Sequence, residues 1–181
     1  WLIFRYVSVV FANSDFVSKS FNKVKNYKVP VIKIYNTISL ISSNQLLDRK
    51  SARNLLKLES NEFVIAVVAR FARRKRQLDM VKSLHYFTDL LPYLKVVFIG
   101  GTGQGQGIDY FQEVYNYTVE SGFEYNCIFT GYRNDANKLY NAFDLLVLPS
   151  EGEPLARVLL EAMNSFVPII ATNDGGNREL I

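Results

Sequence analysis

The chain has 181 residues, of which 49% are apolar and 21% charged, and its formal net charge is +4. This balance predicts a globular protein with a hydrophobic core and excludes an intrinsically disordered chain. The length is typical of one domain, or of one domain and part of another. The mild positive charge favours anionic ligands, and we do not expect nucleic acid as a partner. A single cysteine, Cys127, excludes a disulfide framework and is typical of a reducing, cytoplasmic location.

The first twelve residues are apolar, but the run is short and Arg5 interrupts it. We therefore expect neither a membrane span nor a signal peptide there. The sequence has no initiator methionine and begins in the middle of a strand pattern. This start predicts a piece of a longer protein.

In chain order, the hydrophobic pattern predicts strands that alternate with helices. The first elements are a strand at Tyr6–Ala12, a helix capped by Asn13 or Ser14 that carries Phe16, Val17, Phe21 and Val24, a strand at Val29–Tyr35, and a helix within Asp48–Lys57. Strands follow at 63–69, 95–100, 126–130, 144–148 and 167–171, with helices such as Leu78–Phe87 and Ile108–Ser121 between them. This alternation predicts an α/β fold with a parallel sheet and helices on both of its faces.

The stretch Pro149–Met163 is the most informative part of the sequence. Pro154 is typical of the first position of a helix, which places Glu153 at or just before the helix cap. Glu161 then lies about 12 Å further along the helix, and about 80° around its axis from Glu153. Both carboxylates could therefore face one cleft. The alternative is that Glu153 is a surface turn residue and Glu161 a salt-bridged structural acid.

The start of the same helix is a natural place for a phosphate group. The N–H groups of Leu155, Ala156 and Arg157 would point out of the helix without partners inside it. A ligand with phosphate at this point and hydroxyl-rich groups on either side would satisfy both carboxylates. A nucleotide sugar is such a ligand.

The E-x7-E pattern of Glu153 and Glu161 resembles the donor-site motif of the family 4 retaining glycosyltransferases. These enzymes have GT-B architecture, in which two Rossmann-like domains face each other across a cleft. Six further stretches resemble the family in the same order, and the resemblance covers residues 63–181. They are the strand and loop Val67–Lys75, the strand and Gly-rich turn Val97–Gly103, the strand end Ile128–Arg133, the strand Asp144–Ser150, and the segments Val167–Thr172 and Gly175–Glu179.

The resemblance implies three segments. Residues 1–37 would be the end of an N-terminal, acceptor-binding Rossmann-like domain. Residues 38–60 would form a linker and an introductory helix. Residues 61–181 would form the nucleotide-sugar donor-binding domain, truncated at its C-terminal end. The missing part of the N-terminal domain is therefore an expected partner.

The implied function is that of a retaining glycosyltransferase, with this chain supplying the donor-binding half. It would move a sugar from a nucleotide-diphosphate sugar to a hydroxyl of a glycan or lipid-linked acceptor. Arg70 and Lys75 would clamp the diphosphate, and Glu153 would orient the donor sugar, so these three form the expected catalytic set. Glu161 would hold the ribose hydroxyls.

Other residues are expected to bind the donor through their backbone. The amides of Leu155, Ala156 and Arg157 would contact phosphate, and Gly131 and Tyr132 would lie at the nucleobase. The resemblance implies no metal and no cofactor besides the sugar donor. It also allows peripheral contact with the inner face of a membrane.

Two alternatives stay open. The family usually has glycine where Ala69, Arg76, Ala156 and Phe166 stand, and a methyl group at Ala156 could crowd a phosphate. A catalytically silent GT-B-like module that binds a nucleotide or sugar is therefore the second hypothesis. The basic loop at residues 70–76 could also be a solvated surface or a contact for acidic lipid. The glycines at 100–107 lack the G-x-G-x-x-G spacing of a dinucleotide site.

Overall fold

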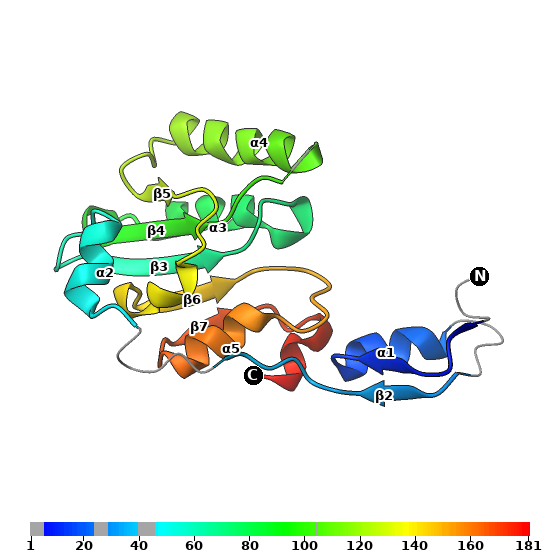
Figure 1. The fold of residues 1–181 in the computed structure, drawn as a ribbon. Helices are drawn as coiled ribbons and strands as arrows, with labels where there is room; N and C mark the ends of the chain where they lie inside the picture. Colours follow the sequence, from blue (N-terminus) through cyan, green and yellow to red (C-terminus); the bar gives the residue numbers. More distant parts are fainter. Residues whose placement is uncertain (1–5, 24–28, 40–45, 104) are drawn as a thin grey trace.

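The computed structural model describes residues 6–23, 29–39, 46–103 and 105–181. Val24, predicted to lie on the first helix, is outside these residues. Two parallel sheets are present (Figure 1). The smaller one pairs β1 (Val10–Ala12) with β2 (Val31–Lys33), and α1 (Asp15–Asn22) connects them. Together these elements form the N-terminal βαβ unit.

The larger sheet has five strands in the order β5-β4-β3-β6-β7, and every neighbouring pair is parallel. The chain builds outward from β3 through β4 to β5 and then returns to the other side of β3. The strand order therefore reverses between β3 and β6. The five strands are β3 (Phe63–Val68), β4 (Leu94–Ile99), β5 (Cys127–Phe129), β6 (Leu145–Leu148) and β7 (Ile169–Ala171).

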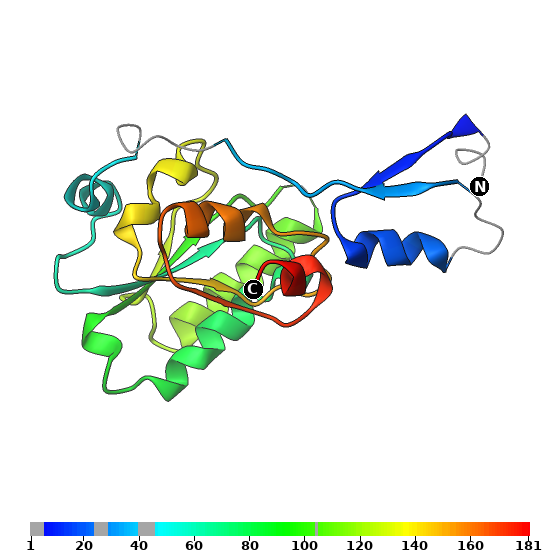
Figure 2. The ribbon, with the colours of Figure 1, turned by 90° about the horizontal axis from the view of Figure 1, so that it is seen from below.

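Helices cover both faces of this sheet, as Figures 1 and 2 show. Because side chains alternate along a strand, Val64 and Ala66 of β3 face one core and Ile65 and Val67 face another. The first core contains residues of α2 (Arg49–Leu55) and α5 (Arg157–Asn164). The second contains residues of α3 (Gln77–Ser83) and α4 (Gln106–Glu120). The predicted parallel α/β fold is confirmed.

Several elements are shorter than the sequence predicted, and two of them show why. Strand β1 covers only the end of the expected Tyr6–Ala12 strand. The Pro30 carbonyl accepts from the Val10 N–H, but proline has no N–H of its own to continue the ladder. Helix α3 ends at Ser83 instead of Phe87, because residues 84–86 tighten into a 3₁₀ turn. Within the described ranges, no helix is both long and apolar enough to cross a membrane.

The N-terminal βαβ unit is hydrogen-bonded to the C-terminal segment of the chain. Ser14, one of the two expected caps, caps α1 by accepting from the Val17 N–H at 3.1 Å. The Glu179 carboxylate accepts from the N–H groups of Asp15 and Phe16, at 2.9 and 3.1 Å. Glu179 ends the 3₁₀ segment Gly175–Glu179, which lies beside the start of α1 in Figures 1 and 2. A carboxylate from one unit thus stabilises the helix start of the other.

Candidate functional site

The candidate site lies at the carboxyl edge of the large sheet, where the strand order reverses. Loops 69–76 and 149–156 follow β3 and β6, the two strands on either side of the reversal. Open α/β sheets bind ligands at such a point, beyond the carboxyl ends of the strands. The expected diphosphate clamp is in the first loop and the expected sugar-orienting acid is in the second.

The two loops are joined by an ion pair between Lys75 and Glu153, whose side chains are only 13% and 6% exposed. The guanidinium of Arg74 lies 4.0 Å from the other carboxylate oxygen of Glu153. The backbone adds a hydrogen bond from the Glu151 N–H to the Arg74 carbonyl at 2.8 Å, and Arg76 pairs with Glu151 at 3.0 Å. The structure therefore brings together Lys75 and Glu153, which the sequence predicted to share one site.

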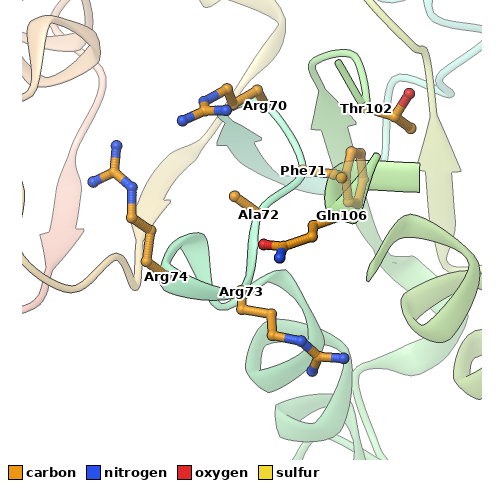
Figure 3. A pocket seen from close by; sticks show the side chains of 8 residues that line it. Arg70, Phe71, Ala72, Arg73, Arg74, Thr102 and Gln106 are labelled. Carbon is orange, nitrogen blue, oxygen red and sulfur yellow. The ribbon is translucent and has the colours of Figure 1, made fainter. Parts of the chain in front are cut away.

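Arg70 lines a cavity of about 460 Å³ beside this ion pair (Figure 3). In Figure 3, Arg70 and Arg74 extend to the same side of the loop, whereas Arg73 extends away from them and pairs with Glu113 at 2.8 Å. The lining residues carry three arginines and no acid, which favours an anionic ligand. They are Arg70, Phe71, Ala72, Arg73, Arg74, Thr102, Gln106 and Gly107.

Gln77 holds the backbone of this loop in place. Its side chain is fully buried, and its Nε2 donates to the Arg70 carbonyl at 3.0 Å. The first residues of α4 also line the cavity, and α4 has no side-chain cap at its start. The positive end of the helix dipole therefore adds to the arginine charges.

The prediction that helix α5 begins at Pro154 is wrong. The helix begins at Arg157, with Ala156 as its cap residue. The Glu153 carbonyl accepts a hydrogen bond from the Gly176 N–H at 2.7 Å. It is therefore not available as the first acceptor of a helix that begins at Pro154. A side chain at Gly176 would overlap the Pro154 carbonyl, which shows how closely the two segments pack. This tertiary contact overrides the local preference of proline for a helix start.

The two acids of the E-x7-E pattern consequently have different surroundings. Glu153 precedes α5 and pairs with Lys75, so the expected 80° relation around one helix does not apply. Glu161 lies on α5 and accepts a hydrogen bond from the Tyr140 hydroxyl at 2.9 Å. Glu161 also lines a cavity of about 170 Å³ together with Arg157. Arg157 is the first residue of α5, at the helix start as expected. Leu155 and Ala156 precede the helix and are buried.

Gly131 and Tyr132 lie beside the Gly-rich turn after β4. The Gly131 carbonyl accepts from the Gly100 N–H at 3.0 Å. Gly100 has φ +155°, and a Cβ atom there would overlap the Ala69 carbonyl. The strand ends of β3, β4 and β5 are therefore closely packed at the candidate site. The Tyr132 side chain is exposed.

Two functional neighbours were not anticipated from the sequence. Asp174 accepts from the N–H groups of Gly152 and Gly175, at 2.8 and 2.7 Å, and so shapes the turn before Glu153. These two backbone bonds lower the pKa of Asp174. An aspartate before Gly-Gly is a common cap, and this signal could have identified it. Tyr140 carries no comparable signal, because its contact with Glu161 depends on packing.

No group of three or more histidine, cysteine or acidic side chains that could hold a metal ion is found in the described part of the chain.

The sequence profile of the family described as "Glycosyl transferases group 1" matches residues 48–181. The chain belongs to this glycosyltransferase family. An Escherichia coli relative, UDP-Gal:alpha-D-GlcNAc-diphosphoundecaprenol alpha-1,3-galactosyltransferase, is 32% identical over 131 residues, which are 70% of this chain and 32% of the relative. The sulfoquinovosyl transferase SQD2 of Arabidopsis thaliana is 31% identical over 59% of this chain and 19% of its own length.

The fold matches that of solved GT-B glycosyltransferases. HepE from Anabaena, in complex with UDP and glucose, has a TM-score of 0.87 and 28% identity. The similarity covers 99% of this chain and 48% of HepE. The complex of HepE with UDP-glucose has the same TM-score. The chain therefore spans about half the length of the solved relative and about a third of the E. coli enzyme.

Two of the positions where glycine was expected show how this chain accommodates larger residues. Ala156 has φ −79°, an ordinary value for any residue, so its methyl group causes no backbone strain. Arg76 has φ +54°, in the left-handed region that favours glycine. Its side chain forms ion pairs with Asp79 at 2.6 Å and with Glu151 at 3.0 Å.

Proposed function

We propose that this chain is the donor-binding half of a retaining glycosyltransferase that uses a nucleotide-diphosphate sugar. One observation carries the proposal. A loop rich in arginine and lysine and a buried glutamate meet at the strand-order reversal of a parallel sheet, and an ion pair joins them. Members of this family act on sugar donors, and this edge of the sheet is where such folds bind ligands.

In the proposed mechanism, Arg70 and Lys75 neutralise the diphosphate as it leaves the sugar. Negative charge grows on the leaving group as the glycosidic bond breaks, so fixed cations stabilise the transition state more than the ground state. The arginines that line the cavity and the uncapped start of α4 add further positive potential around Arg70. The proposed chemistry therefore needs no metal for charge neutralisation.

Glu153 is proposed to orient the donor sugar, and Glu161 to hold the ribose hydroxyls. Lys75 pairs with Glu153, the proposed sugar acid, and is itself proposed to bind the diphosphate, so it would link the two halves of the donor. The incoming acceptor hydroxyl would attack the anomeric carbon from the face that the diphosphate leaves, which retains the configuration. The backbone amides at the start of α5 and at Gly131 would complete the contacts.

The structures of HepE with UDP and UDP-glucose support UDP as the first nucleotide to test. The E. coli relative uses UDP-Gal and a diphosphoundecaprenol-linked acceptor, which supports a lipid-linked or glycan acceptor for the whole protein. We accordingly propose a cytoplasmic location with peripheral contact at the inner face of a membrane. The acceptor contacts would come from the rest of the protein, so the 181-residue chain should bind nucleotide but transfer no sugar.

Thermal unfolding with UDP, GDP and ADP tests the donor-binding proposal. A ligand that binds only the folded state raises the melting temperature, and the shift grows with the logarithm of the ratio of ligand concentration to Kd. We expect one nucleotide to raise the melting temperature of the parent chain and to have a smaller effect on Lys75→Met. If none of the three raises it, donor binding is refuted. If one binds but the full-length protein transfers no sugar, the chain belongs to a catalytically silent binding protein.

A further inference from the structure

Tyr140 is a fully buried tyrosine with its hydroxyl directed at a site residue. It lies in the 3₁₀ segment Tyr140–Ala142, packed beneath α5. The hydroxyl donates to Glu161 Oε2 at 2.9 Å, and the Val158 carbonyl lies further away at 3.5 Å. Burial, followed by the negative charge of Glu161, raises the pKa of Tyr140 well above its ordinary value. The hydroxyl therefore keeps its proton at neutral pH and acts as a donor.

The second oxygen of Glu161 is Oε1. No hydrogen bond to Oε1 is found among the residues that the structure describes. Glu161 lines a cavity of about 170 Å³ with Ile38, Ser39, Asn137, Arg157 and Asn164. A cavity of about 150 Å³ accepts a benzene ring, so this one matches a single five- or six-membered ring and not a whole nucleotide. Its hydroxyl, amide and guanidinium groups suit a ring that carries hydroxyls.

Packing alone does not explain a tyrosine at position 140. The surrounding core is apolar, and the ring already has an edge-on contact with Phe143 at 5.9 Å between centroids. Phenylalanine would make the same contacts without burying a hydroxyl. A buried hydroxyl is costly unless it is hydrogen-bonded, and here its nearest acceptor is Glu161. The contact thus fixes one carboxylate oxygen of a residue that lines the cavity.

We propose that Tyr140 is a positioning residue that holds the Glu161 carboxylate so that its second oxygen receives the hydroxyls of the donor ribose. This inference rests on the proposed function of Glu161. A carboxylate on a glutamate side chain can rotate, and ordering it on binding would cost affinity. Because Tyr140 holds Oε2, the carboxylate is already ordered in the folded protein, and binding does not have to order it. The effect should appear only with ligands that have ribose hydroxyls.

The test measures UDP and 2′,3′-dideoxy-UDP binding to the 181-residue chain by isothermal titration calorimetry. The ratio of the two affinities reports the ribose contacts. Hydrogen bonds to a charged group contribute enough that we expect the parent chain to prefer UDP by about tenfold or more. Tyr140→Phe should reduce this ratio to about two or less, with the affinity for the dideoxy nucleotide unchanged.

Two comparisons separate positioning from a general structural effect. Tyr110→Phe removes another buried tyrosine hydroxyl, which accepts from the Leu78 N–H on the opposite face of the sheet, and it should leave the ratio unchanged. Glu161→Gln should lower the ratio as Tyr140→Phe does, and the double variant should lower it no further, because both changes act on the same contact. A lower melting temperature alone would change the affinities for both nucleotides in parallel and leave the ratio intact.

The outcomes are distinct. A parent chain that prefers UDP, with the same preference in Tyr140→Phe, overturns the positioning role and leaves the proposed function standing. A parent chain that binds both nucleotides equally overturns the ribose role of Glu161 and, with it, this inference, but not donor binding. A parent chain that binds neither of them, and no other nucleoside diphosphate, refutes the proposed function as well.

Discussion

The ion pair between Lys75 and Glu153 gives the sharpest prediction, because neutralising one member should change the affinity for a nucleotide differently from neutralising the other. Lys75→Met removes the cation but keeps the length of the side chain, and Glu153→Gln removes the anion but keeps its shape. If the pair sits at the diphosphate position, Lys75 is shared between Glu153 and the ligand. Neutralising Glu153 should then free Lys75 for phosphate, whereas neutralising Lys75 should weaken phosphate binding.

The expected magnitudes follow from burial. Breaking a buried ion pair by removing one partner costs about 3–5 kcal/mol. Lys75→Met should fall near the lower end of this range, about 3 kcal/mol, because Arg74 still lies 4.0 Å from the Glu153 carboxylate. Glu153→Gln should cost less, about 1–2 kcal/mol, because the long Lys75 side chain can move its ammonium group toward water. The double variant should be no less stable than Lys75→Met, since it leaves no unpaired charge.

Urea unfolding measures these stabilities, and calorimetric titration with UDP measures binding. We expect Glu153→Gln to bind UDP at least as tightly as the parent chain and Lys75→Met to bind it about tenfold more weakly, the loss of a charge-assisted bond to phosphate. Lys50→Met on α2 is the matched control, because Lys50 is exposed and should affect neither property. Equal losses of UDP affinity in Lys75→Met and Glu153→Gln would refute the idea that Lys75 is shared between Glu153 and the phosphate.

Three further predictions concern the framework of the site. Phe166→Gly should raise the free energy of unfolding by about 0.5–1 kcal/mol, because Phe166 has φ +55°, a backbone conformation that glycine adopts more easily, and its side chain is 94% exposed. Chemical denaturation measures this free energy. An equal gain in Phe166→Ala would contradict the backbone explanation. Gly100→Ala should lower the same free energy by more than about 1 kcal/mol, because the added methyl overlaps the Ala69 carbonyl, whereas Gly103→Ala, with open space around it, should lower it less. Burial raises the pKa of Glu179, but the N–H groups of Asp15 and Phe16 and the Tyr35 hydroxyl outweigh burial and lower it overall. Its stabilisation is therefore complete above the pKa in the unfolded state and is lost as the pH falls through the lower folded-state pKa. Unfolding curves recorded across this acidic range should be less dependent on pH for Glu179→Gln, and an unchanged dependence would argue against the cap.

The large sheet was predictable because its strands are apolar runs separated by turns. A strand such as Leu94–Ile99 is buried along its whole length, so its sequence pattern is strong. The meeting of Lys75 and Glu153 was also predictable, since both follow strands and the carboxyl ends of parallel strands share one edge.

Other features depend on tertiary contacts that no local pattern records. The start of α5 was misplaced because the N–H of Gly176, 23 positions after Glu153 in the chain, donates to the Glu153 carbonyl, which a helix beginning at Pro154 would need as an acceptor. The contact of Tyr140 with Glu161 joins residues 21 positions apart, and nothing in the spacing of the sequence marks it. The Glu179 contact with α1 spans the chain almost from end to end. Each case combines elements that lie next to each other only after folding.

The segment Gly175–Glu179 touches two parts of the molecule at once. At one end, the Gly176 N–H holds the Glu153 carbonyl, and at the other end the Glu179 carboxylate holds the start of α1. A change in the angle between the N-terminal βαβ unit and the large sheet would therefore reach Glu153 through the four residues from Gly176 to Glu179, without crossing either hydrophobic core. Glu153, the acid proposed to orient the sugar, is thus mechanically linked to the N-terminal βαβ unit.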